Sequence, residues 1–270
     1  MPLSAENSTL SREYAWGLCY RFFTQNQERL LQADCNEALL LEASVHLSAY
    51  LGFFGMLRGS SFLLKTNPSF FVPIIRDVWQ QARASGYPPD STHPDHVKPL
   101  WDTLNRSLLD ASKDLRETST TPVSHTLISK ILLGMFACTP AYDKFVMRGL
   151  KAISWWTGPK SLQSSSDSKI DAWGAFMNEP MTKVPWEETQ KQYALDESIP
   201  RCRVVDLFLW ELGKMLDNNE KESSQTKSSD KKENSDEILL YSKEIPNVVS
   251  AVNAILAFRA SQNDGSIRPH

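Results

Sequence analysis

Residues 38–57 read ALLLEASVHLSAYLGFFGML, a run of twenty residues that contains no lysine or arginine. A helix of that length is long enough to cross a bilayer. Glu42 and His46 lie in the middle of the run, however, and each is costly in lipid, by roughly 3 kcal/mol for a carboxylate. No basic cluster flanks the run, and the chain has no second one of this length. We therefore predict the buried central helix, at about residues 36–58, of a protein that does not span a membrane.

Helical periodicity continues on both sides of this run. Apolar residues recur at spacings of three and four within 100–109, 127–136 and 205–216, which is typical of amphipathic helices. Alternation with a period of two is nearly absent. The sequence predicts an all-α fold of eight to ten helices in a single domain, formed by residues 1–216 and 238–262.

Residues 217–237 contain no hydrophobic side chain. Such a segment has nothing to bury that would offset the entropy lost on ordering. We predict a disordered polar insertion at 217–237 and a disordered tail at 263–270.

Composition and charge narrow the class of protein. Of the 270 residues, 41% are hydrophobic and 23% are charged, which is ordinary for a globular protein and excludes collagen-like or disordered chains. The net charge of −3 does not favour a nucleic acid as partner. The four cysteines are scattered, and the first residues lack the basic start and apolar run of a secretory signal. These features favour a reducing cytoplasm.

Familiar catalytic signatures are absent from the sequence. It has no GxxxxGK[ST], GxGxxG, HExxH or GxSxG motif, and we predict no cofactor and no metal. His93 and His96 stand beside Asp90 and Asp95, the right ligand types for a metal, but in a proline-rich stretch with no second cluster to complete four ligands. We interpret that stretch as a solvated loop, and whether the protein is an enzyme stays open.

Glu42, His46 and Tyr50 recur every fourth residue on the apolar run. A buried carboxylate beside an imidazole can tune a general base, so Glu42 and His46 are candidate catalytic residues. The alternative, which we favour, is a hydrogen-bonded trio in the core.

Arg58 is followed by Ser60 and Ser61 where this helix is expected to end. Backbone N–H groups at the start of a new helix, next to a guanidinium, suit an anion or phosphate. The favoured alternative is an arginine placed well at a helix C-terminus, with a glycine after it.

Lys130 interrupts a very apolar helix and must extend to solvent, pair with a carboxylate or lie in a cleft. Asp143 and Asp206 are its candidate partners and candidate acid–base groups. A core ion pair is the favoured interpretation; the alternative is an anion site in which Arg58, Lys130 and one aspartate face a common cavity.

Three segments together carry a resemblance: GMLRGSSFLL at 55–64, LLGMFACTPAYD at 132–143 and VDLFLWELG at 205–213. In this order they resemble a family of uncharacterised, largely bacterial hypothetical proteins of similar size. The resemblance extends from about residue 39 to 213 and implies no reaction.

Two functions are compatible with these observations. The first is a helical interaction or regulatory protein without catalysis, which the lack of a catalytic motif favours. The second is an enzyme or binding protein for a phosphate-bearing substrate, a nucleotide or nucleic acid, using Arg58, Lys130 and a carboxylate. The partner is then a protein or a small anionic ligand, and the oligomeric state is not predicted.

Overall fold

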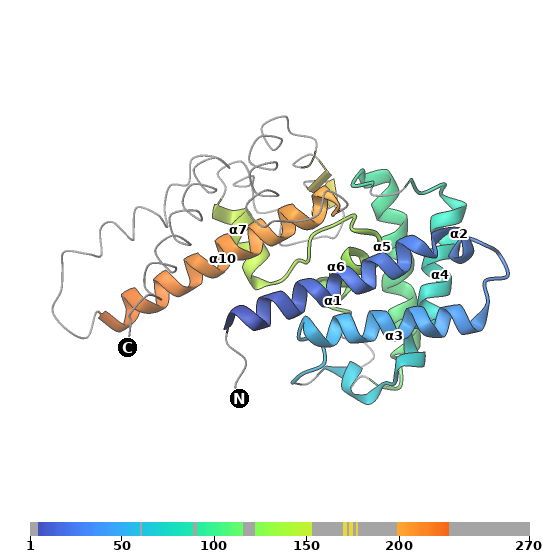
Figure 1. The fold of residues 1–270 in the computed structure, drawn as a ribbon, viewed down its shortest axis with the longest axis horizontal. Helices are drawn as coiled ribbons and strands as arrows, with labels where there is room; N and C mark the ends of the chain where they lie inside the picture. The colour runs from blue at the N-terminus through green and yellow to red at the C-terminus, as the bar shows by residue number, and fades with distance from the viewer. Residues whose placement is uncertain are drawn as a thin grey trace. The chain divides into compact units, whose positions relative to one another are not determined.

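A computed structural model describes residues 5–59, 61–88, 91–115, 122–152, 170–171, 173–174, 177 and 199–226. Within these residues the chain forms eight α-helices and two 3₁₀ helices and no strand, which confirms the all-α prediction (Figure 1). The chain divides into two compact units, residues 1–141 and 142–270. The single domain stays a prediction, and residues 238–262 and 263–270 lie outside the described residues.

The first unit contains most of the helices (Figure 1). They are α1 (Ala5–Gln25), α2 (Gln27–Leu30), α3 (Glu37–Phe53), η1 (Phe62–Lys65), η2 (Pro68–Phe70), α4 (Phe71–Ala84), α5 (Pro94–Ala111) and α6 (His125–Phe136). α1 and α3 run side by side, α3 also packs on α4, and α4 packs on α5. α6 contacts α1, α3 and α5, and its residues from Leu127 to Phe136 are all buried. α6 is therefore the helix most enclosed by this unit.

α3 is the helix expected at 36–58, and it is shorter than expected. The Asn36 side chain caps its start by accepting a hydrogen bond from Ala38 N at 2.8 Å. It ends at Phe53 because Gly55 adopts a left-handed φ of 72° and the Met56 N–H bonds back to Leu51 O at 2.9 Å. One face is buried, while Leu41 and Val45 on the other are exposed.

α3 has 17 residues. No helix in the described part of the chain is long and apolar enough to cross a membrane.

Side chains from α1 and α3 anchor α6. Trp16 Nε1 donates to Leu133 O at 3.2 Å, and the Tyr50 hydroxyl donates to Lys130 O at 3.0 Å. The Tyr50 ring lies against Gly134, where an added Cβ would come within 2.7 Å of the ring. A glycine is therefore needed at that point of the α3–α6 contact.

The second unit is built on α7 (Lys144–Ala152) and α10 (Arg201–Thr226), which pack against each other. Gly149 and Gly213 lie at the contact: a Cβ on Gly149 would overlap the Leu209 carbonyl, and one on Gly213 would overlap the Phe145 carbonyl. The two backbones thus approach closely only because both positions lack a side chain.

The structure contradicts part of the predicted disordered insertion at 217–237, because α10 continues to Thr226. Asp217, the first residue of that segment, is 4% exposed and accepts hydrogen bonds from Lys144 Nζ at 2.5 Å and Arg148 Nη1 at 2.8 Å. Asp217 thus pairs with two cations of α7, a long-range contact that the composition of the segment does not reveal. Residues 227–237 lie outside the described residues.

Candidate functional site

A cavity of about 570 Å³ opens in the first unit where α3 ends and α6 begins. Its described lining is mainly apolar but includes two cations and two hydroxyls. The lining residues are Gly55, Met56, Arg58, Gly59, Ser61, Phe62, Leu64, Lys65, Leu115, Pro122, Val123, Ser124 and Leu127. We call this space the cationic cavity. Its volume lies in the range of small-molecule sites, roughly 300–1,000 Å³.

Two glycines shape the loop that carries Arg58. Gly55 and Gly59 have φ values of 72° and 64°, a region that other residues enter only with strain. The Arg58 guanidinium lies over Gly55, so closely that a Cβ there would be 3.1 Å from Arg58 Cζ. Gly55 thus both ends α3 and makes room for the guanidinium.

The charged side chains in the described lining of the cavity are all positive. Arg58 is exposed and forms no ion pair with a carboxylate of the described residues, and Lys65 Nζ donates to Leu115 O at 3.4 Å. No carboxylate, imidazole or thiol occurs among the described lining residues. Ser124, the N-cap of α6, lies on the wall and brings the partially positive end of that helix to the cavity. Lys65 was not foreseen from the sequence, because a lysine at the end of a short apolar turn is unremarkable there.

The predicted anion-binding residues divide between two roles. Arg58 and Ser61 line the cavity, and the Ser61 hydroxyl also caps η1 by accepting from Leu63 N at 3.3 Å. Ser60 lies outside the described residues. Lys130 does not line the cavity. Its side chain is buried, and Nζ donates to Phe54 O at 3.0 Å, so the ammonium caps the C-terminal end of α3.

The predicted trio on α3 does not assemble. Tyr50 is buried and His46 is half-buried, stacked on the Phe22 ring at 4.4 Å between centroids, but Glu42 is exposed. An α-helix turns by about 100° per residue, so eight residues rotate the face by about 80°. That rotation carries Glu42 out of the core, so Glu42 and His46 do not form a buried carboxylate–imidazole pair.

Asp143 and Asp206 both lie in the second unit and have structural partners there. Asp143 Oδ1 accepts from the N–H groups of Phe145 and Val146, each at 3.0 Å, and so caps the start of α7. Asp206 forms a buried ion pair with Arg203. An ion pair for Asp206 was expected, and Arg203 is one of its partners.

The histidine stretch begins α5. His93 Nδ1 accepts from Asp95 N at 3.3 Å, which makes it the N-cap, and His96 Nδ1 lies 2.7 Å from Ser91 Oγ. No group of three or more metal-ligating side chains occurs among the residues that the structure describes.

Comparison with protein families, curated proteins and solved structures found no match to this chain. The resemblance of the segments at 55–64, 132–143 and 205–213 stays a prediction. The candidate site therefore rests on its own geometry.

Proposed function

We propose that this chain is a cytoplasmic, non-catalytic helical binding protein whose cationic cavity takes the anionic head group of an amphiphilic ligand. The observation that carries the proposal is that Arg58 and Lys65 line a mainly apolar cavity with no carboxylate among its described residues. A guanidinium and an ammonium that line one cavity favour a phosphate or carboxylate.

The apolar wall argues for a ligand with a hydrocarbon part. Met56, Phe62, Leu115 and Leu127 line the same cavity, and Leu64 at its edge is 55% exposed. Each methylene group that leaves water for such a wall contributes about 0.8 kcal/mol. An amphiphile satisfies both parts of the lining, whereas inorganic phosphate satisfies the cations alone.

The chemistry of the lining supports binding over catalysis. General acid–base catalysis needs a group that titrates near neutral pH, and none occurs among the described lining residues. The residues considered for that role lie elsewhere: Glu42 is exposed on α3, and the His46 ring stacks on Phe22. This arrangement weakens the alternative of a phosphate-processing enzyme.

Isothermal titration calorimetry with octyl phosphate, below its micelle concentration, tests the proposal. We expect the full chain to bind octyl phosphate at least tenfold more tightly than inorganic phosphate. Arg58→Gln and Lys65→Gln should each weaken binding about tenfold, because a charge-assisted hydrogen bond contributes about 1.5–3 kcal/mol. Higher salt should weaken binding to the wild type.

Arg83→Gln is the matched control. Arg83 is an exposed arginine on α4 outside the cavity lining, so its loss changes the net charge equally but should leave affinity unchanged. The proposal is contradicted by an absence of measurable binding, or by equal losses in Arg58→Gln and Arg83→Gln.

A further inference from the structure

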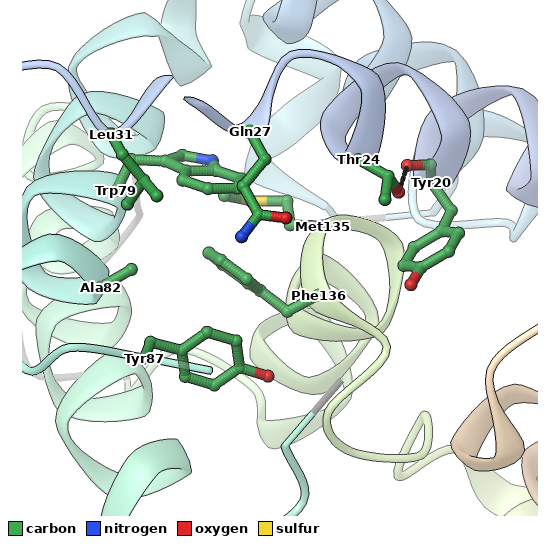
Figure 2. A pocket seen from close by; sticks show the side chains of 9 residues that line it. All are labelled: Tyr20, Thr24, Gln27, Leu31, Trp79, Ala82, Tyr87, Met135 and Phe136. Carbon is green, nitrogen blue, oxygen red and sulfur yellow. Dashed lines mark hydrogen bonds between the residues drawn. The ribbon is translucent and has the colours of Figure 1, made fainter. Parts of the chain in front are cut away.

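The cationic cavity has exposed side chains in its lining, unlike a smaller cavity among α1, α2, α4 and α6 (Figure 2). The smaller cavity has a volume of about 30 Å³, room for roughly one or two water molecules. Its lining is uncharged and mostly buried, as at Trp79 and Phe136. The lining of the cationic cavity instead includes Arg58, Leu64 and Lys65, all exposed. A large partner can therefore reach the cationic cavity directly.

The chain between α3 and η2, residues 54–67, carries two exposed leucines, each followed by an exposed cation. We call it the α3–η2 loop. Leu57 is 39% exposed and precedes Arg58, and Leu64 is 55% exposed and precedes Lys65. Leucines beside cations suit an anionic membrane surface, because apolar groups enter the boundary of the hydrocarbon layer while Arg and Lys reach the phosphate groups.

The local structure holds Leu64 out in water. Its neighbour Leu63 is 1% exposed and anchors η1 in the unit. The Leu64 N–H donates to Ser61 O at 3.1 Å, and the Thr66 hydroxyl donates to Leu63 O at 2.8 Å. Leu63 is thus turned inward and Leu64 outward by a hydrogen-bonded turn. An exposed apolar side chain fixed in this way suits an apolar surface supplied from outside the chain.

The charges around the loop favour an anionic surface. Residues 43–76 contain no Asp or Glu. Lys65 also contacts the chain just after α5, and the end of α5 brings Asp110, which pairs with Lys113 at 2.8 Å, and the exposed Asp114. These described groups together leave a net positive charge at the loop. Each Lys or Arg near an anionic lipid surface raises affinity about fivefold.

We propose that the α3–η2 loop docks on the surface of a membrane that contains anionic lipids. Leu57 and Leu64 enter the boundary of the hydrocarbon layer, and Arg58 and Lys65 stay at the phosphate groups. The cationic cavity then takes its ligand from this surface, in which an anionic amphiphile dissolves. This last step rests on the proposed function, whereas the docking itself does not.

Cosedimentation of the full chain with phosphatidylcholine vesicles, with and without about 30 mol% phosphatidylserine, tests the docking. We expect at least about tenfold tighter binding to the anionic vesicles, and weaker binding at higher salt. Leu57→Gln and Leu64→Gln should each weaken it about fivefold, because each removes apolar area from the contact. Leu41→Gln is the matched control, since Leu41 is 47% exposed near the opposite end of α3 and should not affect binding.

Calorimetry with octyl phosphate separates this inference from the proposed function. Leu57 does not line the cationic cavity, so Leu57→Gln should lose vesicle binding and keep its affinity for octyl phosphate. Octyl phosphate binding without vesicle binding by the wild type overturns the docking and leaves the proposed function standing. Vesicle binding without octyl phosphate binding supports the docking and contradicts the proposed function.

Three further results overturn the docking. One is equal affinity for neutral and anionic vesicles, and another is an equal effect of Leu41→Gln and Leu57→Gln. The third is a dimer in size-exclusion chromatography that Leu57→Gln dissociates, because a second copy of the chain would then cover the loop. If Leu57→Gln does not fold, as judged by circular dichroism, Leu64→Gln replaces it in the vesicle comparison.

Discussion

Lys130 holds a charge inside the first unit, with 6% of the residue exposed. Its Nζ donates to the Phe54 carbonyl and lies 5.7 Å from the centre of the Phe54 ring, so the ammonium is satisfied at the end of α3. The role is structural, and Lys130 is no part of the cationic cavity.

We therefore expect Lys130→Met to lower the free energy of unfolding, by about 1–2 kcal/mol for the lost hydrogen bond, measured by urea denaturation. Octyl phosphate affinity should be unchanged. Equal stability together with lost octyl phosphate binding would instead place Lys130 in the site.

The four cysteines also differ in their accessibility to solvent. Cys19, Cys138 and Cys202 are buried, and burial raises the pKa of the Cys19 thiol. Cys35 is partly exposed, just before α3, and partial burial raises the pKa of its thiol as well.

We expect the folded protein to present one reactive thiol to a disulfide reagent, and Cys35→Ser to remove it. Because the thiolate is the nucleophile and the pKa is raised, the labelling rate should increase with pH through the neutral and alkaline range. Unfolding in guanidinium should release all four thiols. Two or more rapidly labelled thiols in the folded state would contradict the burial.

At the scale of elements, the α7–α10 contact depends on glycines. Gly213→Ala should destabilise the second unit, because a Cβ there would overlap the Phe145 carbonyl and backbone cannot give way cheaply. Gly17→Ala in α1 is the matched control: nothing lies within 4 Å of its Cβ, and alanine favours a helix by up to about 1 kcal/mol. The midpoint temperature of thermal unfolding should fall for Gly213→Ala and should stay the same or rise for Gly17→Ala. A Gly213→Ala protein as stable as the wild type would mean that the helices are not in this close contact.

The helices themselves were largely predictable from local signals. Apolar spacing predicted α5 and α6. The end of α3 was placed too late, because Gly59 was taken as its terminus although Gly55 comes first. Residues 217–226 were expected to be disordered but belong to α10, and the ion pairs of Asp217 with Lys144 and Arg148 are long-range contacts that periodicity does not reveal.

At the scale of the whole molecule, the candidate site was predictable only in part. Arg58 and Ser61 were predicted because they follow the helix end closely in sequence. Ser124 was not, because the cavity joins segments more than fifty residues apart and no local pattern records that contact, and Lys65 was not, because a lysine at the end of a short apolar turn gives no signal. The prediction that Glu42 lies in the core was wrong for a geometric reason. Residues spaced four apart shift gradually around the helix, by about 80° over two turns.

The central claim is that the cationic cavity holds an anionic head group against Arg58 and Lys65. A crystal structure of the full chain with octyl phosphate tests it most directly. The account predicts phosphate oxygens within about 3.2 Å of the Arg58 guanidinium and Lys65 Nζ, with the octyl chain against Phe62 and Leu127. An octyl phosphate bound elsewhere, or one whose phosphate contacts neither cation, would contradict it.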